Sequence, residues 1–215
     1  MNVRNFCCLS VFLFSGHVAL ANENLVEKQV PDCDYTRLTI NVPSTVKLVA
    51  KGGLSGQVKG INKELDTLKY TCSNGEFKID SKSQVSLSKG FIFELSNGSL
   101  SRLTLNGAQK ADITELTANS FTLVLNGASE SLLRGHVEDF IVLLDGAAQV
   151  EASELVSQKG KININGSGLV RLDVDSELSG QVNGSGRIEY LGKPNSLDTN
   201  VIGSGSISLV QRSKI

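Results

Sequence analysis

Apolar and polar residues alternate in short runs along the first half of the chain. Glycines or Asn-Gly pairs separate these runs, which span residues 35–42, 46–48, 76–79 and 91–95. A period of two residues is typical of a strand with one buried face, so the pattern predicts an all-β fold. Residues 61–68 have apolar positions at i, i+4 and i+7, which fits a helix. Because the segment is short, we favour a turn followed by a strand.

The second half of the chain repeats one pattern six times. The spacings between the glycines that end the copies are 20, 19, 20, 18 and 19 residues. An apolar residue stands two positions before each of these glycines, and Asn or Asp directly precedes the first five. A period near 19 residues, held through six copies, identifies an internal repeat. The glycines are Gly107, Gly127, Gly146, Gly166, Gly184 and Gly203.

The repeat predicts a single-stranded parallel β-helix, in which each turn of the chain (a rung of about 19 residues) stacks on the next. An Asn-Gly pair tolerates the positive φ that turns a strand sharply. Equivalent positions then pair in parallel at ~4.8 Å, and their apolar side chains stack into one core. We expect a right-handed coil, because parallel crossover connections are right-handed. The predicted structural turn residues are Asn106, Gly107, Asn126, Gly127, Asp145, Gly146, Asn165, Gly166, Gly168, Asn183, Gly184, Gly186, Gly203 and Gly205.

The Asn and Asp residues at these turns are expected to stack into a polar ladder. Their side-chain amides should form hydrogen bonds from rung to rung. The less regular first half is interpreted as earlier, irregular rungs and the cap that closes the column.

Residues 1–21 have the parts of a secretory signal peptide in the right order. A basic residue is followed by an apolar stretch at 6–14 and by an Ala-Leu-Ala cleavage signal. We therefore expect export to the periplasm, the outer surface or the medium. Residues 22–34 are predicted to be a linker, and residues 35–215 one β-helix domain. No later apolar stretch reaches the ~18 residues of a membrane helix.

Two of the four cysteines, Cys7 and Cys8, lie in the predicted signal peptide, which leaves Cys33 and Cys72. In an exported, oxidising context this pair is expected to form a disulfide. Two buried free thiols are the alternative. A zinc site is disfavoured, because two cysteines without a nearby histidine do not supply four ligands.

The charge balance narrows the class of partner. The chain holds 21 Lys and Arg against 22 Asp and Glu, a net charge of −1. Without a basic field to attract phosphates, nucleic acid is not expected as a partner. The 21 glycines exceed the usual ~7% of residues, and the repeat places nine of them at equivalent corners.

Two late segments carry a Gly-Ser-Gly corner between strands. Residues 183–194 read Asn-Gly-Ser-Gly-Arg-Ile-Glu-Tyr-Leu-Gly-Lys-Pro, and residues 201–208 read Val-Ile-Gly-Ser-Gly-Ser-Ile-Ser. These strings resemble the GIN domain family, the "putative autotransporter adhesin head domain", and the likeness extends over residues 35–211. It departs at the first three corners, where Asn-Gly-Ala or Asp-Gly-Ala stands instead. The resemblance implies an exported β-helical protein with an adhesin-like role and no established catalytic residues.

The sequence contains no convincing catalytic constellation, and neither a cofactor nor a metal is expected. His136 is the one histidine after residue 21, and without a Gly-x-Ser-x-Gly motif we interpret it as a surface residue at a bend. Gly166-Ser-Gly168 lacks the third glycine, the lysine and the helix of a phosphate loop. Asp173 and Asp175 could line one face of a rung, as acidic groups do in β-helical polysaccharide lyases. The ordinary explanation is that both are strand residues exposed to solvent.

Three functions remain open. The one we favour is a non-enzymatic envelope or secreted protein whose long β surface binds a surface, a glycan or an envelope protein. The alternatives are a polysaccharide-active enzyme built on a β-helix and a periplasmic structural or spacer protein. Because an open β-helix end invites edge pairing, an end-to-end homodimer is a further hypothesis.

Overall fold

The computed structural model describes residues 25–82 and 90–211, and most of them belong to one fifteen-stranded sheet. The predicted signal peptide, residues 1–21, lies outside the described residues. The elements of the described ranges are β1 (Leu25–Gln29), β2 (Arg37–Ile40), β3 (Ser44–Val49), β4 (Ser55–Ile61), α1 (Asn62–Leu65), β5 (Leu68–Ser73), β6 (Glu76–Ser81), β7 (Phe91–Ser96), β8 (Arg102–Gly107), β9 (Lys110–Gly127), β10 (Glu130–Gly146), β11 (Gln149–Gly166), β12 (Leu169–Gly184), β13 (Arg187–Leu191), β14 (Ser196–Gly203) and β15 (Ser206–Leu209).

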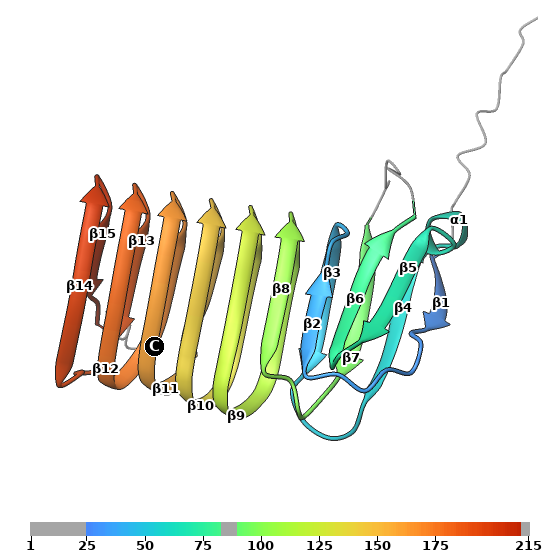
Figure 1. Cartoon of the computed structure of the whole chain (residues 1–215), viewed down its shortest axis with the longest axis horizontal. Coiled ribbons are helices and arrows are strands. Elements are labelled where there is room, and N and C mark those ends of the chain that lie inside the picture. The colour runs from blue at the N-terminus through green and yellow to red at the C-terminus, as the bar shows by residue number, and fades with distance from the viewer. Residues whose placement is uncertain (1–24, 83–89, 212–215) are drawn as a thin grey trace, which may run out of the picture.

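The predicted stacked parallel coil is confirmed, with about 20 residues per turn. Strands β9 to β12 each follow most of one rung, and each pairs in parallel with the next. Gly146 of β10 lies between Gly127 of β9 and Gly166 of β11, so the corners stack in register. Figure 1 shows the rungs side by side along the long axis, with β14 and β15 at one end. Strands β1, β4 and β5 and helix α1 lie at the other end.

Each rung has two faces, which meet at the glycine corner. The pre-corner face consists of β6, β2, β8, the last parts of β9 to β12, and β14. The post-corner face consists of β7, β3, the first parts of β9 to β12, β13 and β15. The chain passes from one face to the other at the corner and returns through a bend, which is residues 115–121 in β9.

Inward side chains stack into buried columns along the core. Successive rungs place aliphatic residues on top of one another, and each such side chain removed from water contributes ~1.5–3 kcal/mol. This stacking explains why the apolar position two residues before the glycine recurs in every copy. One column, with members between 0% and 1% exposed, is Ile79, Ile40, Leu105, Leu125, Leu144, Ile164 and Val182.

The N-terminal rungs stack out of chain order. Strand β2 lies between β6 and β8, and β3 lies between β7 and β9, all in parallel. The rung made by β6 and β7 therefore lies farther from the C-terminal end of the column than the rung made by β2 and β3, although it comes later in the chain. Strands β4 and β5 then pair antiparallel with β7 and β6, and β1 pairs antiparallel with β4. The expected irregular rungs and cap are present, but contacts between distant segments decide their order.

The prediction of a linker over residues 22–34 is wrong for its described part. Leu25–Gln29 forms strand β1, and Val30 and Cys33 are buried in the core. All five residues of β1 are exposed. Backbone hydrogen bonds to β4 therefore hold this strand, and an edge strand of this kind leaves no apolar alternation in the sequence.

The expected turn at residues 61–68 is a single helical turn followed by a strand. Asn62–Leu65 forms α1, and β5 begins at Leu68. Leu65 is buried against Gly60, where an added Cβ would lie 3.1 Å from Leu65 Cδ2. Packing of this leucine, rather than helix propensity, stabilises so short a helix.

Candidate functional site

The predicted turn glycines line one corner of the column. The six glycines that end the copies, from Gly107 to Gly203, have φ between +118° and +130°. A Cβ on Gly127 would lie 2.5 Å from the carbonyl oxygen of Gly107 in the preceding rung. Gly168, Gly186 and Gly205 face inward, and a Cβ on Gly168 would lie 2.7 Å from Leu144 Cδ1. Backbone and core atoms occupy the space around these glycines, so the corner turns the chain and leaves no cradle for a phosphate.

The polar ladder at this corner forms in two segments. Asn126 Nδ2 donates to Asn106 Oδ1 at 2.6 Å. Asn183 donates to Asn165 at 2.9 Å, and Asn165 donates to the Asp145 carboxylate at 2.8 Å. One segment ends at Asn126 and the other begins at Asp145, because an ionised carboxylate has no proton to donate to the preceding rung.

The ladder continues into the N-terminal rungs through two residues that the sequence reading missed. Asn106 donates to Asn41 Oδ1 at 2.6 Å, and Asn41 donates to the Asp80 carboxylate. Both residues directly follow a buried isoleucine, as the later ladder residues follow an apolar one. Neither precedes a glycine, so a search for Asn-Gly pairs does not find them.

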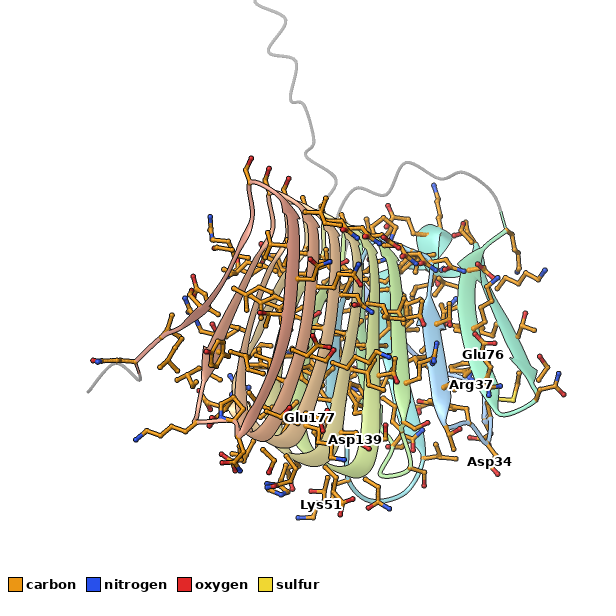
Figure 2. All side chains as sticks on the ribbon, turned by 60° about the vertical axis from the view of Figure 1, so that its left-hand side comes forward. Asp34, Arg37, Lys51, Glu76, Asp139 and Glu177 are labelled. Atoms are coloured by element: carbon orange, nitrogen blue, oxygen red, sulfur yellow. A yellow bond between two sulfur atoms is a disulfide. The ribbon has the colours of Figure 1, made fainter. Side chains whose placement is uncertain are left out.

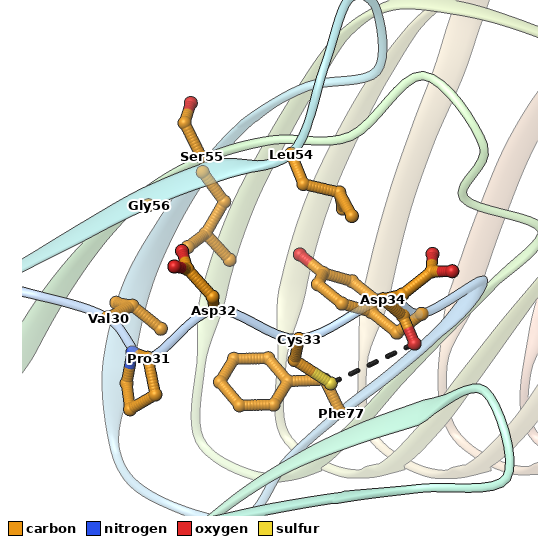
Figure 3. A pocket seen from close by; sticks show the side chains of 11 residues that line it. Val30, Pro31, Asp32, Cys33, Asp34, Leu54, Ser55, Gly56 and Phe77 are labelled. Atoms are coloured by element: carbon orange, nitrogen blue, oxygen red, sulfur yellow. Dashed lines mark hydrogen bonds between the residues drawn. The ribbon is translucent and has the colours of Figure 1, made fainter.

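The predicted disulfide is present at the N-terminal end of the column. Cys33 and Cys72 are bonded across 39 residues of chain. Beside Cys33 a cavity of about 260 Å³ lies between the segment before β2 and strand β4 (Figure 3). Leu54 and Phe77 supply part of its apolar wall. This volume is below the ~300–1,000 Å³ of typical small-molecule sites.

The post-corner face carries opposite charges that pair from rung to rung. Arg134, for example, contacts Asp112 at 2.7 Å and Glu154 at 3.3 Å. Pairing of this kind satisfies the charges within the face and leaves few of them for a partner. The ion pairs in the described part of this face join Lys47 and Lys59 to Glu94, Lys110 to Glu130, Arg134 to Asp112 and Glu154, and Arg171 to Glu151 and Glu189.

Glu94 accepts more hydrogen bonds than its neighbours on this face. Lys59 donates to it at 2.8 Å, Gln57 at 2.6 Å and Lys47 at 3.3 Å. These three donors, Lys59 first, lower the pKa of Glu94 from 4.5 to about 2. The carboxylate therefore stays charged and ties β7 to both of its neighbouring strands.

The pre-corner face has a different surface, with an apolar strip at its centre. We define the strip as Thr104, Val124, Ile141 and Leu143, which point outward between fully buried neighbours and are half-buried themselves. Thr104, Val124 and Leu143 are cross-strand neighbours in successive rungs.

Two cations flank the strip. Arg102 and Lys161 occupy the same cross-strand column as Ile141, two rungs before it and one rung after it. Both side chains are exposed, and within residues 25–82 and 90–211 neither has an ion-pair partner. The strip and the two cations form one surface, and Asp139 and Glu177 line the hollow that contains Ile141 and Lys161.

The residues considered for catalysis do not come together. Asp173 is 1% exposed whereas Asp175 is exposed, so the two carboxylates do not share a surface. His136 is exposed on the bend. Along the same edge, Asp139 and Glu177 lie on either side of Lys159 in the strand register (Figure 2). Across the described residues, no group of three His, Cys, Asp or Glu side chains is placed to hold a metal ion.

The described part of the chain contains no helix long and apolar enough to cross a membrane. The stacked coil and its two unlike faces define a β-solenoid protein. Residues 34–194 match the family described as "Putative auto-transporter adhesin, head GIN domain". The chain therefore belongs to the GIN domain family.

Solved structures show the same architecture. A crystal structure of a "putative adhesin" from Bacteroides fragilis has a TM-score of 0.65 at 14% identity, covering 87% of this chain and 98% of its own. A "putative lipid binding protein" from Parabacteroides distasonis (18% identity) and a "putative adhesin" from Parabacteroides merdae (12% identity) both have a TM-score of 0.53. Each covers 88% of this chain and 98% of its own. The likeness concerns the fold, and no curated protein matches the chain.

Proposed function

We propose that the chain is an exported, non-enzymatic envelope or secreted protein that binds an acidic protein partner, in the manner of an adhesin. Membership of the GIN domain family supports the adhesin class. The observation that carries the proposal is the apolar strip between Arg102 and Lys161 on the pre-corner face. Export rests on the signal peptide predicted over residues 1–21.

The chemistry of the strip favours a protein over a glycan. Protein interfaces commonly combine an apolar centre with a polar rim in which arginine is enriched. Two cations that have no ion-pair partner among the described residues are complementary to carboxylates on the other surface, which would speed association and fix its orientation. The phenylalanine and tyrosine rings of the described residues are buried or half-buried, so none of them is exposed to stack on a sugar ring.

The same geometry gives less support to an enzymatic function on polysaccharides. A polysaccharide-active site would need acidic and basic groups that converge on one cleft. Here Asp173 is buried and Asp175 is exposed on the bend, so these two carboxylates do not converge on one cleft.

Binding of the fluorescently labelled chain to cultured epithelial cells and to isolated bacterial envelopes tests the proposal. We expect saturable binding that is lost after the cells or envelopes are treated with protease and kept after periodate oxidation of their glycans. The double variant Arg102→Glu/Lys161→Glu should weaken binding at least ~10-fold, because repulsion replaces attraction. Arg187→Glu is the matched control: it reverses an exposed cation on the post-corner face and should bind like the wild type.

Each remaining outcome points to another function. Loss of binding after periodate would indicate a glycan ligand. New unsaturated products from acidic polysaccharides would overturn the non-enzymatic assignment. No saturable binding, together with co-purification in an envelope complex, would favour a structural or spacer role.

A further inference from the structure

The last rung of the column, β14 and β15, ends in a sheet edge. We call residues 196–209 the terminal rung. Strand β14 pairs with β12 along Ser196–Gly203, and β15 pairs with β13 along Ser206–Leu209. On their other side, neither strand has a partner among the described residues. Within the described residues, the outer side of these two strands, twelve residues long in total, is therefore unpaired.

The terminal rung also leaves the apolar core open. Leu197 and Val201 stack on Leu178 and Val182, which are both 0% exposed. At the terminal rung the same inward positions are 50% and 39% exposed. Leu209, stacked on Tyr190, is 58% exposed. The end of the column therefore exposes apolar side chains that are buried in the earlier rungs.

The terminal rung lacks the features that natural proteins use to protect a sheet edge. Charged residues and prolines usually blunt such edges. Residues 196–211 contain one charge, Asp198, and no proline. At the ladder position Ile202 replaces the Asn or Asp of earlier rungs and is 60% exposed.

The opposite end of the column is protected. Its outermost strands are β1 and β5, which run antiparallel to their neighbours. Lys28 of β1 forms an ion pair with Asp66 after α1 at 2.7 Å, and Glu27 contacts Lys59 at 3.5 Å. The two ends are therefore not complementary to each other, and head-to-tail stacking of copies is disfavoured.

From these observations we infer that the terminal rung binds the terminal rung of a second copy of this chain, head to head about a two-fold axis. A two-fold axis sets the paired strands antiparallel, and directly opposite residues then lie on the same face of the sheet. Inward residues of both copies therefore join one continuous core. With one carboxylate per copy in the rung, little charge repulsion opposes this contact. On its inner side the rung pairs in parallel with β12 and β13, and its inward residues stack on theirs.

Sedimentation velocity of the full chain from 1 to 200 μM tests the inference. We expect a concentration-dependent dimer, about twice the 22.9 kDa of the single chain. Ile202→Lys and Leu209→Lys each place a charge on an exposed residue of the edge, and each should weaken the dimer at least ~10-fold. Because both side chains are exposed, the thermal melts of these variants should stay close to the wild type.

Leu25→Lys on β1 is the matched control. Leu25 is 47% exposed at the opposite end, so this variant should dimerise like the wild type. A wild-type chain that stays monomeric at every concentration overturns the inference. A dimer weakened by Leu25→Lys but not by Leu209→Lys also overturns it, because association would then use the N-terminal end.

Discussion

Asn165 donates a hydrogen bond of 2.8 Å to Asp145 in the preceding rung and accepts one of 2.9 Å from Asn183 in the following rung. Asn106 is placed in the same way, between Asn41 and Asn126. Asn126 only donates, because Asp145 has no proton to offer it. These positions allow the ladder to be tested one hydrogen bond at a time.

We expect Asn106→Ala to destabilise the fold more than Asn126→Ala. The first variant loses two side-chain hydrogen bonds and the second loses one, and each is worth ~0.5–1.5 kcal/mol. Urea unfolding of both variants measures the difference, which should be about the value of one bond. Asn165→Ala and Asn183→Ala repeat the comparison in the second segment. Equal losses within each pair would contradict the expectation that stability depends on the number of ladder hydrogen bonds lost.

Gly127→Ala should lower the free energy of unfolding by at least ~2 kcal/mol. The new Cβ would lie 2.5 Å from the Gly107 carbonyl oxygen, at a residue with φ of +130°, and backbone strain of this kind costs ~1–3 kcal/mol before any clash. Gly53→Ala is the control, because no atom lies within 4 Å of its added Cβ. Similar urea midpoints for the two variants would show that the corner tolerates a side chain.

Removal of the disulfide should destabilise the N-terminal end of the column. For a loop closed across 39 residues, the chain-entropy account gives a loss of ~4 kcal/mol. The double variant Cys33→Ala/Cys72→Ala and the reduced wild type should unfold at similar urea concentrations. Limited proteolysis should then cut first in the segment around β1, whose residues are all exposed. If oxidised and reduced chains had the same midpoint, the bond would not contribute to stability.

Lowering the pH should lower the free energy of unfolding, partly because Glu94 becomes protonated. Its pKa is about 2 in the folded chain and 4.5 ordinarily, so its charged form stabilises the fold above about pH 4.5. That contribution is lost as the pH falls from 4.5 toward 2. Urea unfolding at several pH values should show a smaller loss of stability in this window for Glu94→Gln than for the wild type. Lys59→Met should reduce the pH dependence as well, since Lys59 is the main donor. An unchanged pH dependence in both variants would contradict the assignment.

The sequence by itself determined the class of fold and the residues of the corner. A glycine every 18 to 20 residues, with an apolar residue two positions earlier, predicts a stack of equivalent rungs. The structure has this arrangement. The disulfide between Cys33 and Cys72 was equally predictable, because the other two cysteines, Cys7 and Cys8, lie in the predicted signal peptide. These features depend on local periodicity and composition, which one chain displays directly.

Only the tertiary structure decided how the irregular segments and the surfaces are arranged. The rung of β6 and β7 lies outside that of β2 and β3, and β1 forms from exposed residues, because pairing between distant strands carries no local pattern. The same reason hid Asn41 and Asp80 at the start of the ladder. Alternation marks which residues point outward, but not which cations find partners there. In the described part of the chain, Arg134 forms ion pairs on one face while Arg102 and Lys161 form none on the other, because the register between rungs sets each residue's neighbours.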